Sequence, residues 1–232
     1  MLHLVNLIVK ICLFLIIVSC NRDYRISNHE SQLIEIKSSI DTNILKIINP
    51  YKISLEEEMN TILSYSKSEL KKGQPESKLG NFVCDLSMKK ANGQADFCIL
   101  NNGGLRNIIP EGDVRVKDIF QVMPFENELV IIELDKTEFY ELLSYVVNRG
   151  GEPIGGIQII QKEDTIFSNL NNKKNVRVLT TDYLANGGDN MYFLKGKYQK
   201  KLGIKMRDAI IEYCRNSDTI NGSLDNRLIL RC

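Results

Sequence analysis

Short apolar runs that end in glycine turns alternate with helical patterns along this chain of 232 residues. One such run, residues 97–100, leads directly into Asn101–Arg106, which contains two glycines. Just before it, Leu79, Phe82 and Leu86 fall at helical spacing. Strands that alternate with helices pack as sheets covered by helices. We therefore expect an α/β (α+β) fold with mixed β-sheets.

The same patterns place the individual elements. We expect helices over residues 43–59 (with an interruption near Pro50), 75–91, 116–122, 138–147 and 204–214. We expect strands over residues 33–40, 61–66, 96–100, 128–134, 154–161 and 175–181.

The first twenty residues have the pattern of a secretory signal. Lys10 precedes an apolar run that is short for a membrane span, which needs about 20 residues. The run ends in Ile17-Val18-Ser19-Cys20, which resembles a bacterial lipobox with Cys20 as the lipidated residue. We expect a signal peptide over 1–19, a lipidated tether over 20–32 and one domain over 33–232. The protein would then be lipid-anchored in the bacterial cell envelope, on the periplasmic or surface side; the alternative is an ordinary signal peptide with an accidental cysteine.

The charge balance limits the kinds of partner, and the positions of two cysteines predict their state. Without Lys10 the chain has 29 basic and 29 acidic side chains, and this balance argues against nucleic acid as a partner. Cys84 and Cys98 lie in apolar runs, so we expect buried free thiols there.

Histidine is confined to His3 and His29, which lie in the expected signal and tether. Neutral imidazole is a common ligand in metal-dependent phosphatases, and a serine triad needs a histidine base. We therefore assign no catalytic residue and no metal ligand to the domain.

Residues 182–189 place an aromatic ring, a Gly-Gly turn and a carboxylate within one short stretch. Glycines allow positive φ and a close approach of the backbone to a ligand. Tyr183 offers a face to a planar group, and Asp189 accepts hydrogen bonds. The stretch fits either a ligand clamp or a tight turn with Tyr183 in the core.

Two further segments carry polar or aromatic groups at turns. The glycine turn at residues 101–106 exposes backbone N–H groups that suit an anion, and Arg106 follows it; the alternative is a sharp turn with a surface arginine. In Met123–Asn127 a proline fixes the turn, Phe125 supplies a ring, and Asn127 has both donor and acceptor groups. Taken alone, this segment favours Phe125 as a core residue.

Five segments in series resemble the C-terminal domain of the 5′-nucleotidases. They are Lys78–Asn81, Asn101–Arg106, Met123–Asn127, Gly155-Gly156 and Asp182–Asp189. The resemblance covers residues 33–215 and implies a domain that binds the nucleoside part of a nucleotide.

The resemblance also implies roles for single residues. Phe125 and Tyr183 would stack on the two faces of the base, and stacking tolerates different bases. Asp189 would hold ribose hydroxyls, Asn127 the base edge, and Arg106 would face the phosphates. The remaining substrate-binding residues would be Lys78, Asn101, Gly103 and Gly156.

Three positions depart from the family pattern. Lys78 stands where arginine is common, and keeps the charge without the bidentate geometry. Tyr183 replaces the usual phenylalanine, and Asn102 stands where glycine is frequent.

The family enzymes also carry a metallophosphatase domain with two metal ions, to which nothing in this sequence corresponds. We expect one half of a split enzyme of nucleotide catabolism, with no cofactor of its own and with divalent metals on a separate metallophosphatase chain. The alternatives are a stand-alone nucleoside-binding lipoprotein without catalysis, and a remnant whose pocket no longer binds.

Overall fold

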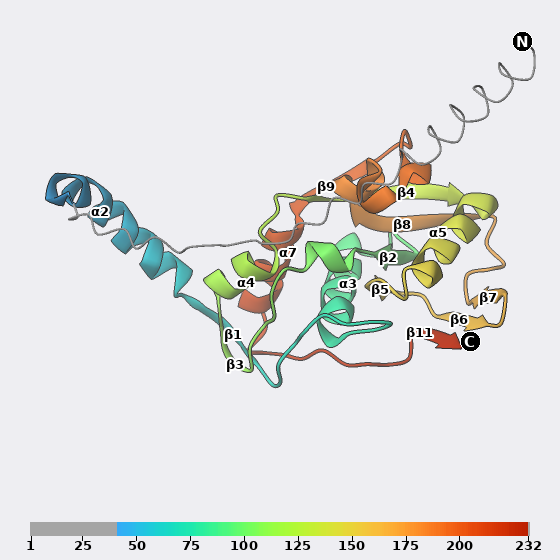
Figure 1. Ribbon diagram of the computed structural model, residues 1–232, viewed down its shortest axis with the longest axis horizontal. Helices are drawn as coiled ribbons and strands as arrows, with labels where there is room; N and C mark the ends of the chain where they lie inside the picture. The colour runs from blue at the N-terminus through green and yellow to red at the C-terminus, as the bar shows by residue number, and fades with distance from the viewer. Residues whose placement is uncertain (1–40, 232) are drawn as a thin grey trace, which may run out of the picture. The chain divides into compact units, whose positions relative to one another are not determined.

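The structure is a computed structural model, and it describes residues 41–231 (Figure 1). The chain divides into two units after Leu45, so that only residues 41–45 of the first unit are described. The predicted strand at 33–40, Cys20 and the predicted tether lie outside the described residues.

The central element of the second unit is a five-stranded mixed sheet. β2 pairs in parallel with β8, and the other three pairs in this sheet are antiparallel. Figure 1 shows the two long strands, β4 and β8, side by side. The order of the strands is β5 (Ile154–Gly155), β2 (Phe97–Ile99), β8 (Asn175–Thr181), β4 (Glu128–Asp135) and β9 (Lys200–Lys205).

Both faces of this sheet are buried under helices. Along β4, Val130 and Ile132 belong to one apolar core, whereas Leu129 and Ile131 belong to the other. This alternation follows from the period of two residues in a strand. The first core is shared with α5 (Lys136–Asn148) and α6 (Asp182–Ala185), and the second with α3 (Lys78–Ala91), α4 (Val116–Val122) and α7 (Met206–Arg215).

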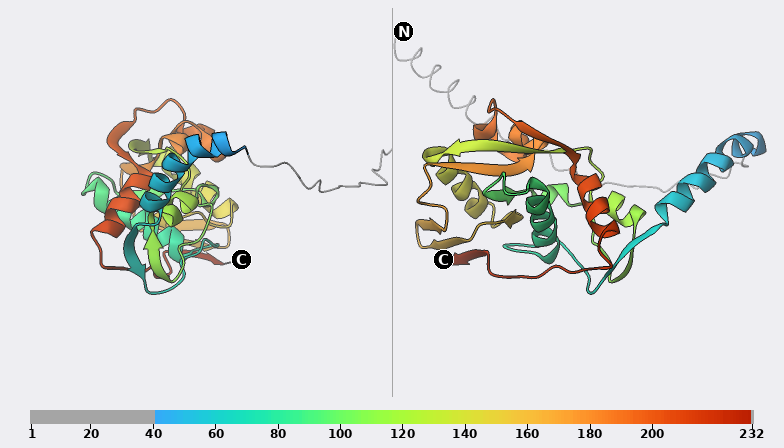
Figure 2. Two further views of the ribbon diagram at one scale, coloured as in Figure 1. Left: turned by 90° about the vertical axis from the view of Figure 1, so that its left-hand side faces the viewer. Right: turned by 180° about the vertical axis from the view of Figure 1, so that it is seen from behind.

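Two smaller sheets complete the described part, and each contains one parallel and one antiparallel pair. In both, a late strand of the chain pairs with an earlier one, as the dark red β11 beside β6 shows in Figures 1 and 2. The first sheet has the order β10 (Thr219–Ile220), β1 (Ile62–Ser66), β3 (Gly112–Arg115); the second has the order β11 (Leu228–Arg231), β6 (Ile159–Lys162), β7 (Thr165–Ser168). The expected fold class, α/β with mixed sheets covered by helices, is confirmed.

The structure corrects two of the predicted elements. Helix α2 (Thr42–Met59) continues through Pro50, and no residue of α2 is buried, so that water can satisfy the carbonyl group that the proline leaves without a donor. The predicted strand at 154–161 is two strands, β5 and β6, in different sheets. Gly156, with φ +78°, separates them, because an extended strand cannot continue through that backbone conformation.

The start of α3 and the burial of two cysteines are close to what the sequence predicts. Helix α3 begins at Lys78 rather than at 75, because Ser77 caps it by accepting a hydrogen bond from the Gly80 N–H. Cys84 and Cys98 are buried, as expected. Within residues 41–231, no helix has the length and apolar character that crossing a membrane requires.

Candidate functional site

One edge of the five-stranded sheet gathers three loops that are distant in the sequence. Since β2 and β8 are parallel, their carboxyl ends lie at the same edge. Strand β4 is antiparallel to β8, with Leu129 opposite Thr181, so that β4 begins where β8 ends. The loops after β2, before β4 and after β8 therefore meet, as ligand-binding loops do at sheet edges in other α/β folds.

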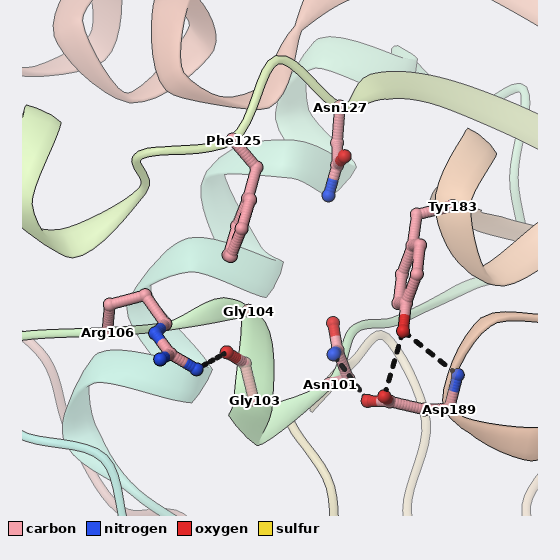
Figure 3. Close-up of a pocket in the computed structure, with 8 residues that line it drawn as sticks. All are labelled: Asn101, Gly103, Gly104, Arg106, Phe125, Asn127, Tyr183 and Asp189. Atoms are coloured by element: carbon pink, nitrogen blue, oxygen red, sulfur yellow. Dashed lines mark hydrogen bonds between the residues drawn. The ribbon is translucent and has the colours of Figure 1, made fainter.

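A pocket of about 250 Å³ lies among these loops (Figure 3). Its volume is somewhat below the range of about 300–1,000 Å³ usual for small-molecule sites. It is lined by Asn101, Gly103, Gly104, Arg106, Phe125, Asn127, Tyr183 and Asp189. The structure thus brings together all the residues that the sequence predicts for the site except Lys78 and Gly156.

The two aromatic rings stand on opposite sides of the pocket (Figure 3). Phe125 is 41% exposed and Tyr183 is 43% exposed, so neither ring is a core residue. The reading of Phe125 as core, which its local pattern favours, is therefore wrong. An exposed ring face on each side of a pocket suits a flat, apolar ligand group.

Glycine at 188 sets the position of the Tyr183 ring. A Cβ atom built on Gly188 would lie 2.5 Å from the ring atoms Cε1 and Cζ. The preceding Gly187 has φ +90°, a conformation that favours glycine. The Gly-Gly pair therefore serves two purposes, a left-handed turn and a close approach to the ring.

The Asp189 carboxylate is fixed on the floor of the pocket, as the dashed lines of Figure 3 show. The Tyr183 hydroxyl lies 3.1 Å from Oδ1 and donates to it, and the Asn101 amide donates to Oδ2. Asn101 is itself buried. The carboxylate is thus oriented by the loops that follow β2 and β8.

The glycine turn after β2 is held in place by Glu152, which no local sequence pattern marks. The Glu152 carboxylate is buried and accepts a hydrogen bond of 2.7 Å from the Asn102 N–H. Burial raises the pKa of Glu152, although Asn102 and the nearby Arg149 favour its charged form. Within the turn, a Cβ atom on Gly104 would come within 2.8 Å of the Asn101 Oδ1, so a side chain there would displace the Asn101 amide.

The loop that carries Phe125 and Asn127 is held by the start of α7. The Arg207 guanidinium donates to the Pro124 carbonyl at 3.2 Å, pairs with Glu126, and lies 4.2 Å from the centre of the Phe120 ring. The Met206 N–H donates to the Asn127 carbonyl. No local pattern marks Arg207, because its partners lie some eighty residues earlier in the sequence.

Arg106 lies on the Phe125 side of the pocket, next to the glycine turn (Figure 3). Its backbone N–H donates to the Val122 carbonyl at 2.8 Å, whereas its guanidinium makes a long contact of 3.4 Å with the Gly103 carbonyl. The backbone is thus fixed, and the guanidinium is available to an anion that enters the pocket.

Lys78 and Gly156 lie elsewhere in the structure. The Lys78 ammonium group is 3.2 Å from the Ser68 hydroxyl, at the start of α3. A Cβ atom on Gly156 would meet the Asp96 carbonyl and the Met88 side chain, both at 3.0 Å. Neither Lys78 nor Gly156 therefore lines the pocket.

The described residues do not fit a metal centre. Between residues 41 and 231 the sequence has no histidine, and no three cysteine, aspartate or glutamate side chains gather there in a way that would hold an ion.

Comparison with known proteins identifies the family. Residues 59–150 match the family model described as "5'-nucleotidase, C-terminal domain". The chain is 29% identical over 127 residues to a 5'-nucleotidase of Vibrio vulnificus, a match that covers 52% of this chain and 23% of that protein. It is 31% identical over 180 residues to the trifunctional nucleotide phosphoesterase protein YfkN of Bacillus subtilis, covering 72% of this chain and 11% of that protein. The chain therefore spans a small part of the length of these relatives.

Solved structures share the fold. The crystal structure of a 5'-nucleotidase precursor from Thermus thermophilus superimposes with a TM-score of 0.67 at 22% identity, over 82% of this chain and 43% of that one. The NAD nucleotidase of Haemophilus influenzae superimposes with a TM-score of 0.57 at 17% identity, over 77% and 40% of the two chains. Residues 59–150 therefore belong to the family of 5'-nucleotidase C-terminal domains, and the described chain has the mixed α/β fold of that domain.

Proposed function

We propose that this domain binds nucleosides and nucleotides in the pocket between Phe125 and Tyr183, as the substrate-specificity part of a 5′-nucleotidase-type hydrolase. The observation that carries the proposal is the pair of half-exposed rings on opposite sides of a pocket with a fixed carboxylate, Asp189, on its floor. Stacking of a base on an aromatic side chain contributes about 1–3 kcal/mol.

The polar groups of the pocket match the other parts of a nucleotide. Asp189 would accept hydrogen bonds from ribose hydroxyls, and the Asn127 amide, which points into the pocket in Figure 3, would bond the base edge. Arg106 would pair with a phosphate, because guanidinium is suited to bidentate phosphate contacts. The names of the relatives, nucleotidases and a nucleotide phosphoesterase, support this class of ligand.

Calorimetric titration of the full chain, purified in detergent, tests the proposal. Adenosine, AMP and UDP-glucose would be titrated into the wild type and into the Phe125→Ala/Tyr183→Ala double variant. Loss of both stacking faces is expected to weaken binding at least about 30-fold, since each face contributes about 1–3 kcal/mol. The matched control is Phe167→Ala/Tyr198→Ala, which removes two exposed rings that do not line the pocket.

The titration has one result that supports the proposal and one that refutes it. Binding by the wild type and the control, with little binding by the Phe125/Tyr183 variant, supports a base site between the rings. If the wild type binds none of the three ligands at millimolar concentration, the proposal is wrong.

We further propose that the metal chemistry of hydrolysis comes from a separate metallophosphatase chain, because residues 41–231 contain no metal-binding cluster. The purified chain with AMP and Mn²⁺ is then expected to release no phosphate by itself. Phosphate release is expected once a metallophosphatase from the membranes of the source bacterium is added. Release of phosphate by the purified chain alone would contradict this part of the proposal.

A further inference from the structure

The backbone at Asp189 is in an uncommon conformation for a residue with a side chain. Its φ and ψ are 49° and 34°, and the next residue, Asn190, has φ 66°. Residues other than glycine rarely occupy this left-handed region, and they remain there when surrounding contacts hold them. Aspartate tolerates this region better than most residues do, and contacts around it stabilise the conformation further.

Two tyrosine hydroxyls supply this support. Tyr145 donates a hydrogen bond of 2.7 Å to the Asp189 carbonyl. The Tyr183 hydroxyl accepts from the Asp189 N–H at 3.2 Å and also donates to the side-chain Oδ1 at 3.1 Å. Tyrosine hydroxyls thus bind both backbone polar groups of Asp189, while Tyr183 and Asn101 each bind one carboxylate oxygen.

Tyr145 acts from outside the pocket. It lies on α5, does not line the pocket, and packs against the Phe193 ring with 6.1 Å between ring centres. The Arg149 guanidinium lies 5.9 Å from the centre of the Tyr145 ring. Partial burial raises the pKa of the Tyr145 phenol, so that the hydroxyl keeps its proton near neutral pH and remains a donor.

We propose that Tyr145 is a positioning residue that holds Asp189 in its left-handed conformation and so sets the selectivity of the pocket for the vicinal hydroxyls of a ribose. This inference rests on the proposed function. An ionised carboxylate has about four acceptor sites, two on each oxygen. The Asn101 and Tyr183 hydrogen bonds use one site on each oxygen, and one site on each remains for a sugar hydroxyl.

The first test compares two nucleosides that differ in these hydroxyls. Kd for adenosine and for 2′,3′-dideoxyadenosine would be measured with the full chain, with Tyr145→Phe, and with Tyr140→Phe as the matched control on the same helix. Tyr145→Phe is expected to weaken adenosine binding about three- to tenfold and to leave dideoxyadenosine binding unchanged. A merely structural role would weaken both nucleosides equally, and that result, or no change in either, would overturn the proposal.

The second test needs no ligand. Amide hydrogen exchange of residues 187–191 is expected to accelerate in Tyr145→Phe, whereas exchange in β4 stays at the wild-type rate. Unchanged exchange at 187–191 would overturn the positioning role even if nucleosides bind. Faster exchange there, in a protein that binds no nucleoside, would support the positioning of Asp189 while the proposed function fails.

Discussion

Single residues explain how much of the pocket the sequence could predict. The stretch 182–189 indicates a clamp because glycines, ring and carboxylate are neighbours in the sequence, and the structure places Tyr183 and Asp189 in one pocket. Tyr145 and Glu152 support this site through hydrogen bonds to residues more than forty positions away. No local pattern reports such contacts, so they could not be predicted.

The close approach at Gly188 gives a prediction at the residue scale. Gly188→Ala places a methyl group 2.5 Å from the Tyr183 ring and is expected to displace the ring and to weaken adenosine binding about tenfold. Calorimetric titration measures the change. Gly73→Ala is the control, because its nearest neighbour would be 3.7 Å away, and equal affinity of the two variants would show that the ring position is unimportant.

At the scale of elements, the sequence predicts the strands whose side chains are buried. The apolar runs at 128–134 and 175–181 correspond to β4 and β8, which are buried on both faces. Strand β9 was not predicted, because three of its six residues are lysines; it borders the sheet, and Lys201 pairs with Glu128 at 2.8 Å. A short bordering strand with charged side chains has no apolar run to mark it.

The join between β2 and β8 gives a prediction about pH. The Asp96 carboxylate precedes β2 and accepts hydrogen bonds from Lys173 and from the backbone and guanidinium of Arg177. Burial opposes the charged form, but these hydrogen bonds outweigh it and hold the pKa of Asp96 well below its ordinary value. Asp96→Asn is expected to lower the free energy of unfolding by about 1.5 kcal/mol at pH 7. This value is at the lower end of the range for hydrogen bonds to charged groups, because Lys173 and Arg177 are half-exposed and water screens their charges.

The sign of the pH dependence follows from the depressed pKa. A carboxyl group whose pKa is lower in the folded state stabilises the fold above its unfolded pKa of about 3.9, and this contribution is lost as the pH falls further. Urea unfolding of the wild type and Asp96→Asn is therefore expected to give a constant difference above about pH 5 that shrinks below about pH 4. A difference that grows on acidification would refute the assignment.

At the scale of the whole molecule, the sequence predicted the fold class but not the arrangement of strands. Alternating strands and helices indicate a mixed sheet, whereas the order β5-β2-β8-β4-β9 depends on pairings between distant segments. That order is what brings residues 101–106, 125–127 and 183–189 to one edge. From the sequence, only the family resemblance predicts that these three segments form one site; hydrophobic periodicity does not.

We propose that the whole protein is a lipoprotein of the bacterial envelope, anchored through Cys20. Metabolic labelling with a palmitate analogue is expected to mark the wild type and Cys12→Ser, the control, and to leave Cys20→Ser unlabelled, because a lipobox directs the lipids to that one cysteine. Label that persists in Cys20→Ser would exclude this anchor.

The central place of β8 has a consequence for how small a piece of this protein is stable. The family match covers residues 59–150 and stops before β8, the strand that lies between β2 and β4. A protein made from that stretch alone would leave the facing edges of two apolar strands without hydrogen-bond partners, and such edges pair with other molecules. We expect it to aggregate, so the segment by which the family is recognised is shorter than the segment that can exist as a soluble monomer.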